Sequence, residues 1–310
     1  MREAPKLPKG YSKVGDDVAV VPRGEGDVIM KVDMLVEHTD VPMGMSYREA
    51  SRKSVAMCVS DFAAKGVKPD SFMASIGLRK TVTQGEVEGL ARGFRDAERE
   101  WGVRMVGGDT NEADELVIDC SMVGFAKRVV TRGGARPGDV LVVSGTFGSP
   151  PAGLLVLGGK AAAKPAFGER AKLSVLRPSP SLKTGLALAP HLSSAMDSSD
   201  GLARSLHTLA RESSVGFDIT SLPGAEGAEE FALDNGLDYA KLVLEGGEEY
   251  VIVGTVEASK LEIAKVAARR AGGRLLAIGS ATSRKGRVRL VQDGRASPIK
   301  DRGWTHLRRR

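Results

Sequence analysis

The sequence predicts a two-domain α/β (α+β) protein with mixed sheets, and three observations lead to this fold class. The chain has 310 residues, 42% of them hydrophobic and 27% charged, which suits two ordinary globular domains. Strand-like and helix-like segments alternate in both halves, and hairpin-like spacings argue against strict βαβ repeats. A polar Gly/Pro-rich junction at 132–139 separates the halves, so the predicted domains are residues 1–135 and 136–310.

The first third is predicted to run strand, strand, helix, strand, helix, strand. Residues 27–36 are rich in β-forming types, and their alternation gives one face to Ile29, Lys31, Asp33 and Leu35. A capping box at 46–49 opens a helix that ends at Gly66. A second helix is predicted at about 84–100 and a further strand at 116–126.

The second part is predicted to begin with a strand at 140–144 and a Gly/Pro turn at 145–151. The later expected elements are a helix, a strand ending at Asp197, helices at about 200–211 and 260–271, and strands at 215–220, 250–256 and 287–291. These elements complete a second mixed sheet with its own helices.

Cysteine content and hydropathy exclude several protein classes. Cys58 and Cys120 lie far apart and near no histidine pair, so neither a disulfide framework nor a zinc site is predicted. The first ten residues lack the apolar core of a signal peptide, and no stretch reaches the roughly 18 apolar residues of a membrane span. We expect a soluble, cytoplasmic protein with no membrane partner.

The net charge of +6 and the pI of about 9.3 indicate nucleic-acid binding only weakly. The basic residues are scattered, the one pure run is 308–310, and aromatics at 5% are too few for a stacking platform. A surface that attracts an anionic small molecule explains the charge equally well. We therefore expect no nucleic-acid partner.

Acidic residues recur beside glycine or a small residue where elements are predicted to end. The places are 15–17, Asp33, Asp61, 107–110, 197–201 and 246–249. Most have an ordinary explanation as turns or helix caps. Asp33, however, shares a strand face with apolar residues, and Asp61 lies near the C-terminus of an apolar helix, where it opposes the helix dipole. Carboxylates without histidine or thiolate partners indicate a hard cation, Mg²⁺ first, and several of them indicate several ions and a polyphosphate.

Other motifs narrow the class of enzyme. Gly107 and Gly108 allow close approach of a phosphate, and the helix after Asp200 offers free N–H groups to an anion. The sequence contains no Walker A motif, no G-x-G-x-x-G after a first strand, no kinase catalytic loop and no G-x-S-x-G elbow. The residues alone therefore predict a magnesium-dependent nucleotide enzyme outside the P-loop class, without nucleophilic catalysis; His207 and Cys58 are expected to be packing residues.

Taken together and in order, these motifs resemble the archaeal-type thiamine-monophosphate kinases, in the superfamily of aminoimidazole ribonucleotide synthetase. The matching stretches are VGDDVA at 14–19, DMLV at 33–36, SDFAAKG at 60–66, GGDT at 107–110, TR at 131–132, RPGD at 136–139, DSSDGL at 197–202, GGEEY at 246–250 and GWTH at 303–306. The resemblance covers essentially the whole chain.

The resemblance implies ATP-dependent phosphorylation of thiamine monophosphate to thiamine diphosphate, with ATP as co-substrate and several Mg²⁺ ions. The implied magnesium ligands are Asp17, Asp33, Asp61, Asp109, Asp197 and Asp200, of which Asp17, Asp33, Asp61 and Asp109 position the metals for catalysis. The implied nucleotide contacts are Gly108, Asp109, Arg132 and Ser199, and the implied thiamine phosphate contacts are Asp40, Glu248 and Trp304. The family fold has two α/β domains, and its N-terminal sheet forms a barrel across a homodimer.

Three positions depart from the family pattern. Lys31 and Val32 stand where the family usually has hydroxyl residues that serve one metal, so the number of metals is open and the charge of Lys31 is a candidate substitute for one. Asp40 stands where bacterial relatives often carry histidine, and Glu249 replaces a commoner aspartate.

Three alternatives stay open. The chain could be another ATP-using member of the superfamily with a different substrate, a non-catalytic nucleotide-binding regulator, or a nucleic-acid binder indicated by pI alone. Trp304 favours a planar aromatic substrate over the first alternative. Retention of aspartate in all the clusters argues against a pure regulator.

Overall fold

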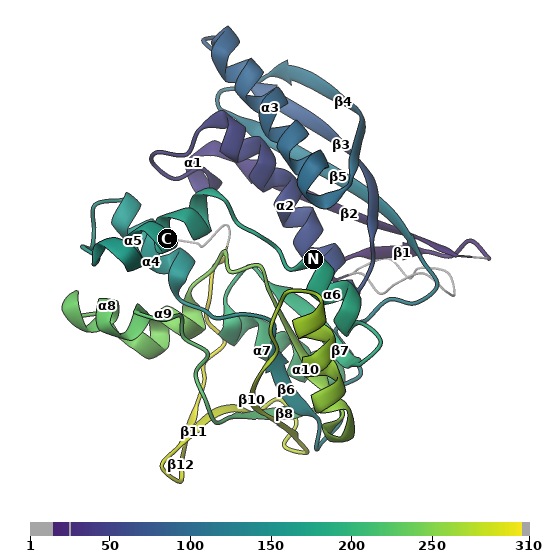
Figure 1. Ribbon diagram of the computed structural model, residues 1–310, viewed down its shortest axis with the longest axis vertical. Coiled ribbons are helices and arrows are strands. Elements are labelled where there is room, and N and C mark those ends of the chain that lie inside the picture. The colour runs from purple at the N-terminus through teal and green to yellow at the C-terminus, as the bar shows by residue number, and fades with distance from the viewer. Residues whose placement is uncertain (1–14, 25, 306–310) are drawn as a thin grey trace.

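A computed structural model describes residues 15–24 and 26–305, which form two mixed sheets with helices packed on them (Figure 1). The predicted α/β class with mixed sheets is confirmed. The first ten residues, Val14, His306 and the terminal run 308–310, on which parts of the sequence argument rest, lie outside the described residues.

The N-terminal sheet has five strands in the order β1-β2-β5-β3-β4. Its strands are β1 (Ala19–Val21), β2 (Asp27–Val36), β3 (Pro69–Leu78), β4 (Arg104–Glu112) and β5 (Val117–Ala126). All neighbours pair antiparallel except β3 and β4, which are parallel. The predicted order has one strand after the second helix and so omits β4; residues 107–110, expected where an element ends, instead lie inside this edge strand.

Strand β2 has the alternation that the sequence predicts. Ile29 and Leu35 are fully buried under helices, whereas Met30 and Val32 on the opposite face are about half exposed. Because side chains alternate along a strand, Lys31 and Asp33 must point to the same side as the buried pair. The site therefore begins with two charged residues on a covered face.

Helix α2 (Tyr47–Lys65) packs between the N-terminal sheet and the C-terminal half (Figure 1). The predicted capping box is present, since Ser46 Oγ accepts from the Glu49 N–H and a Glu49 carboxylate oxygen accepts from the Ser46 N–H. Gly66 ends the helix in the left-handed conformation at φ 66°, as predicted. Nearly every residue of α2 is buried, because elements cover it on both sides.

Helix α3 (Gln84–Trp101) covers the same face of the sheet beside α2, and its start and end agree with the prediction. Glycine makes this contact close, because a Cβ at Gly93 would lie 2.0 Å from the carbonyl oxygen of Arg48. The short α1 (Glu37–Asp40) follows β2 and leads toward α2.

The C-terminal sheet has seven strands in the order β12-β11-β8-β10-β6-β9-β7. These are β6 (Val140–Val143), β7 (Leu192–Ser198), β8 (Gly216–Ile219), β9 (Val251–Val256), β10 (Leu276–Thr282), β11 (Val288–Gln292) and β12 (Arg295–Pro298). The helices of this half are α4 (Ser149–Leu157), α5 (Pro165–Leu176), α6 (Leu182–Leu188), α7 (Leu202–Ser213), α8 (Ala228–Asp234), α9 (Tyr239–Glu245) and α10 (Leu261–Arg270), with a 3₁₀ turn at Ala258–Lys260. The strands predicted at 140–144, 215–220, 250–256 and 287–291 are confirmed within a residue or two, whereas α8, α9, β10 and β12 were not predicted.

A continuous hydrophobic core joins the two halves. Val55 and Phe62 of α2 belong to the same buried cluster as Leu192, Ile252 and Val256 of the C-terminal sheet. The domain boundary between residues 135 and 136 therefore remains a prediction, because one core includes residues from both sides of it. Within 15–24 and 26–305, no helix is both long enough and apolar enough to cross a membrane.

Candidate functional site

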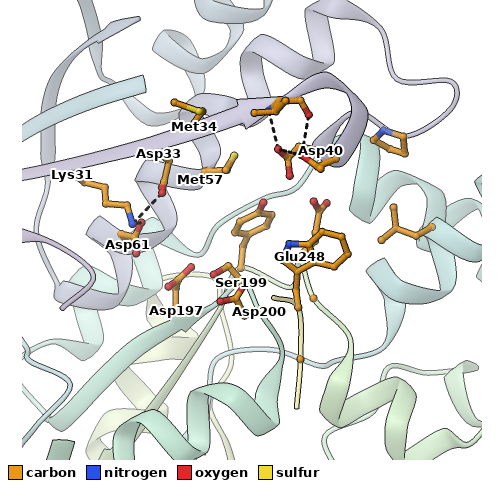
Figure 2. Close-up of a pocket in the computed structure, with 18 of the residues that line it drawn as sticks. Lys31, Asp33, Met34, Asp40, Met57, Asp61, Asp197, Ser199, Asp200 and Glu248 are labelled. Atoms are coloured by element: carbon orange, nitrogen blue, oxygen red, sulfur yellow. Dashed lines mark hydrogen bonds and ion pairs between the residues drawn. The ribbon is translucent and has the colours of Figure 1, made fainter. Parts of the chain in front are cut away.

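A cavity of about 710 Å³ lies between the N-terminal sheet and the loops at the ends of the C-terminal strands. Figure 2 shows Lys31, Asp33, Asp61 and Asp197 toward one end, Asp40 and Glu248 toward the other, and Ser199 and Asp200 between them. We call the end with Asp33, Asp61 and Asp197 the acidic end and the end with Asp40 and Glu248 the second end. The Ser199 hydroxyl and the Asp200 carboxylate lie between them.

Three loops from distant parts of the sequence are joined along this cavity. Glu248 N–H donates to the Ser199 carbonyl at 2.7 Å, Tyr250 N–H to the Ser198 carbonyl at 3.1 Å, and Trp304 N–H to the Asp200 carbonyl at 3.0 Å. Glu248 and Tyr250 adopt φ angles of 64° and 49°, which side chains with a Cβ rarely do. Such conformations cost energy and occur most often at ligand sites, where surrounding contacts hold them.

The acidic end is built from three elements. Asp17 comes from the loop before β1, Asp61 from α2 and Asp197 from β7, and all three are buried. One oxygen from each lies within 4.8 Å of the others, an arrangement that could hold a metal ion. We call these three residues the aspartate triad, and together with Asp16 and Asp33 we call them the acidic cluster.

Three cations contact the acidic cluster. Lys31 Nζ lies 2.8 Å from Asp61 Oδ2 and 3.1 Å from Asp33 Oδ1. Lys65 Nζ, which is fully buried, lies 2.7 Å from both Asp16 Oδ1 and Asp17 Oδ2 and donates to the Ala195 carbonyl. Arg132 donates through Nε to Asp17 Oδ1 at 2.8 Å.

These cations do not compensate the negative charge fully. Burial, followed by the neighbouring charge of Asp197, raises the pKa of Asp61 well above its usual value despite Lys31. Burial and the charge of Asp17 raise the pKa of Asp197 to about 6. By contrast, the contacts with Lys65 outweigh burial and lower the pKa of Asp16. Buried carboxylates with an uncompensated charge and oxygen donors alone are a donor set that fits Mg²⁺.

The second end of the cavity is organised by Lys53, a buried lysine of α2. Its Nζ lies 2.6 and 2.7 Å from the two carboxylate oxygens of Glu248 and 2.8 Å from the Asp40 carbonyl oxygen. The Asp40 carboxylate accepts from the Val36 N–H and from the Thr39 hydroxyl, which fixes it at the end of α1. Trp304 is half exposed and lines the same cavity.

The structure brings most of the predicted site residues together. Those that line the cavity or belong to the acidic cluster are Asp17, Asp33, Asp40, Asp61, Arg132, Asp197, Ser199, Asp200, Glu248 and Trp304. Gly108 and Asp109 lie instead on the exposed edge strand β4, three strand positions from β2. At about 4.8 Å per strand, that places them roughly 14 Å across the sheet from Asp33.

Glu249, the third departure from the family pattern, faces away from the acidic end. Its carboxylate accepts from the Gly148 N–H at the start of α4, and burial raises its pKa well above the usual value even though this hydrogen bond lowers it. A role in fixing α4 follows from these contacts.

Lys53 and Lys65 were missed as candidate site residues. Both lie on α2, a helix whose polar residues are not gathered on one face and on which almost every position is buried. A lysine in such a helix must find a carboxylate or carbonyl partner, so the absence of a polar face on α2 is the signal that could have found them. Cys58 and His207 are packing residues as predicted, since Cys58 is fully buried and a His207 ring nitrogen contacts the Ile299 carbonyl.

Comparison with known proteins connects this site to a family. Residues 15–126 match the family model described as AIR synthase related protein, N-terminal domain. The chain is 38% identical over 297 residues to the thiamine-monophosphate kinase of Nitrosopumilus maritimus, covering 96% of this chain and 94% of that one. It is 36% identical to the thiamine-monophosphate kinase of Pyrococcus horikoshii, covering 80% and 78%.

Solved structures agree with the sequence relatives. A structure described as AaThiL complexed with AMPPCP and TMP superposes with a TM-score of 0.83 at 26% identity, covering 95% of this chain and 92% of that chain. The hydrogenase maturation protein HypE, at 19% identity and a TM-score of 0.74, covering 91% and 90%, shows the shared fold alone. The residues of the cavity, the family model and the extent of the 38% identity lead to one conclusion: the chain belongs to the thiamine-monophosphate kinase family.

Proposed function

We propose that this protein transfers the γ-phosphoryl group of ATP to thiamine monophosphate, forming ADP and thiamine diphosphate. The observation that carries the proposal is one cavity that two members of the aspartate triad, Asp61 and Asp197, line at one end and that Glu248, Asp40 and Trp304 line at the other. Support also comes from a structural relative, described with AMPPCP and TMP, that aligns over nearly the whole chain.

The acidic end is assigned to the nucleotide. The aspartate triad would hold Mg²⁺, with Asp33 and Asp200 on either side, and Arg132 and Ser199 would contact the phosphates. When bound, Mg²⁺ would offset the charge that develops on the transferring phosphoryl group. Because the triad is buried, a metal ion held there would have a fixed position, and the polyphosphate of ATP would be held in one orientation.

The second end is assigned to thiamine monophosphate. Trp304 offers an aromatic face to the planar rings, and Met57 and Tyr250 line the same space. Glu248, whose carboxylate Lys53 fixes, would accept a hydrogen bond from the substrate, with Asp40 beside it. In this placement the acceptor phosphate would lie toward Ser199 and Asp200, which Figure 2 shows between the two ends.

Transfer is proposed to be direct and in line. An oxygen of the acceptor phosphate attacks the γ-phosphorus, the bond from that phosphorus to the β–γ bridging oxygen breaks, and ADP leaves with the bond's electron pair. The attacking oxygen is already ionised near neutral pH, so no side chain needs to remove a proton. Cys58, buried in the core, and His207, held on the Ile299 carbonyl, are unsuited to carry a phosphoenzyme.

A homodimer is part of the proposal. Five apolar side chains are exposed on the face of the N-terminal sheet opposite α2 and α3: Met30, Val32, Met34, Met73 and Phe125. A second copy packed on this face would bury them and close the two sheets into a barrel. The same packing would cover β4, so that Gly108 and Asp109 reach ATP in the assembly although they lie apart from the triad within one chain.

The experiment that tests the function is phosphorus NMR of the protein with ATP, Mg²⁺ and thiamine monophosphate, and a control without acceptor. Thiamine diphosphate appearing with ADP is the expected result. ADP with free phosphate but no thiamine diphosphate would indicate that the protein uses ATP and that its acceptor is another substrate of the superfamily. Absence of ATP turnover would contradict the proposal and favour a nucleotide-binding regulator.

Two substitutions test the residue assignments. Asp61→Asn and Asp109→Asn should each lower kcat by about 10²-fold or more, because each removes a carboxylate that is proposed to hold Mg²⁺ against the reacting phosphates. The matched control is Asp70→Asn, which makes the same change at an exposed position of β3. Near-normal turnover of a folded Asp61→Asn protein would overturn the metal assignment.

The dimer is tested separately by light scattering after gel filtration. Phe125→Glu should shift a dimer toward monomer, whereas Leu233→Glu, at an exposed position on α8, should not. A wild-type protein that runs as a monomer would refute this part of the proposal.

A further inference from the structure

Lys31 occupies a position between two carboxylates that a metal ion could otherwise occupy. Its ammonium nitrogen lies 2.8 Å from Asp61 Oδ2 and 3.1 Å from Asp33 Oδ1, and its side chain is 19% exposed (Figure 2). It reaches this place from β2, whose covered face it shares with Asp33. The position is therefore set by the strand's alternation and does not depend on a flexible loop.

The acidic cluster divides into two neighbouring sets of oxygens that share Asp61. Asp17, Asp61 and Asp197 bring one oxygen each within 4.8 Å of one another, whereas Asp33 lies outside this triad and is paired with Lys31. Lys31 engages Asp61 Oδ2, so the carboxylate that it holds is also a member of the triad.

The charges of the cluster agree with this division. Four of its five carboxylates contact the three cations Lys31, Lys65 and Arg132, whereas Asp197 accepts a hydrogen bond from the Ser60 hydroxyl at 3.2 Å. Ionised throughout, the five carboxylates would leave two uncompensated negative charges, which is the charge of one divalent ion. With a neutral side chain at position 31, the deficit would be three, and a second divalent ion between Asp33 and Asp61 would become favourable.

We propose that the Lys31 ammonium is a resident cation that takes the place of a second divalent ion between Asp33 and Asp61. The nucleotide-free protein then binds one divalent ion per chain, at the aspartate triad. This inference rests on the proposed function in taking the triad as the magnesium site. Lys31 acts as a positioning residue, because it holds the Asp61 carboxylate, which is shared with the triad.

The test is a count of Mn²⁺ bound per chain, by equilibrium dialysis and by the free-Mn²⁺ paramagnetic resonance signal, without ATP or thiamine monophosphate. Wild type should bind one ion, Lys31→Ser should bind two, and Lys31→Ser combined with Asp33→Asn should bind one again. Lys68→Ser is the matched control, since it makes the same change at an exposed lysine beyond the end of α2, and it should bind one. Two ions on wild type, or one ion on Lys31→Ser, would overturn the inference.

A second measurement needs no substitution and so does not depend on how the variants fold. Reductive methylation followed by peptide mass spectrometry should find Lys31 protected to the same extent with and without saturating Mn²⁺. Methylation of Lys31 that rises several-fold with Mn²⁺ would show that metal displaces the ammonium, which would overturn the inference. Phosphorus NMR decides the kinase activity independently, so one Mn²⁺ with no transfer would refute only the proposed function, and transfer with two Mn²⁺ would refute only the role of Lys31.

Discussion

Replacing Lys65 with methionine should destabilise the protein strongly, and Mg²⁺ should offset part of the loss. The Lys65 ammonium contacts Asp16 and Asp17 at 2.7 Å each and donates to the Ala195 carbonyl of β7. Lys65 and Asp17 side chains are both fully buried. The substitution removes one partner from a buried ion pair while keeping most of the side chain's volume.

The magnitude follows from these contacts. Breaking a buried pair by removing one partner costs about 3–5 kcal/mol. Arg132 still contacts Asp17 in the variant, and methionine fills most of the vacated space, so we expect a loss of about 3 kcal/mol in EDTA. The extra negative charge also strengthens binding of Mg²⁺ at the triad, and each tenfold gain in affinity restores about 1.4 kcal/mol at saturating Mg²⁺.

The assay is urea denaturation in EDTA and in Mg²⁺, followed by circular dichroism and by tryptophan fluorescence. Trp101 and Trp304 lie in different halves, so agreement of the two signals tests whether the halves unfold together. Lys80→Met is the control, because Lys80 is exposed and pairs with Glu112 at the surface, and it should change stability by less than about 0.5 kcal/mol. If Lys65→Met were as stable in EDTA as Lys80→Met, the reasoning about the buried cations would be refuted.

Three further predictions concern pH, packing and substrate binding. The pKa of Asp197 is raised from 3.8 to about 6, so the folded protein binds this proton more tightly than the unfolded chain and loses stability as pH rises through that window. In EDTA, the free energy of unfolding of Asp197→Asn should therefore rise relative to wild type by up to about 3 kcal/mol between pH 4 and pH 7.5. A difference that is constant with pH would contradict this. Gly93→Ala should lower the free energy of unfolding in urea by more than about 2 kcal/mol, because its Cβ would meet the backbone of α2. Gly85→Ala in the same helix meets open space and should be neutral or stabilising, and equal stabilities of the two variants would refute the close contact. Trp304→Ala should raise KM for thiamine monophosphate about tenfold with KM for ATP unchanged, and equal changes in both constants would argue against its place on the thiamine side.

Local patterns predicted the parts of the fold that local interactions determine. The alternation of β2 and the capping box at Ser46 each involve neighbours within a few residues, so their physical causes are visible in the sequence. Among the elements missed in the C-terminal half, β12 forms a local hairpin with β11 across Asp293 and Gly294, whereas α8 has seven residues and packs its Phe231 on Phe167 of α5. Short segments of this kind carry too little periodicity to be recognised alone.

In the candidate site, too, local signals in the sequence were sufficient for some residues and not for others. Unusual placement of Asp33 and Asp61 on apolar faces predicted a cation nearby, and the structure brings Asp61 together with Asp17 and Asp197. The partners of Lys53 and Lys65 lie up to 195 residues away in the chain, so no local pattern predicts them. Asp109 could be recognised as a motif, but its position on β4 depends on strand order, which the sequence leaves open.

The enclosed position of α2 has a consequence for how the chain is made. One side of the helix packs on β2 and β5, and the other packs on α6, β7 and β9, which follow it by more than a hundred residues. During translation, the helix and its first sheet emerge from the ribosome long before the strands that cover the second side, and synthesis proceeds at about 5–20 residues per second. For several seconds the nascent protein presents this second side of α2 uncovered, so a ribosome stalled near residue 150 should carry a chain that binds chaperones until the remaining strands are synthesised.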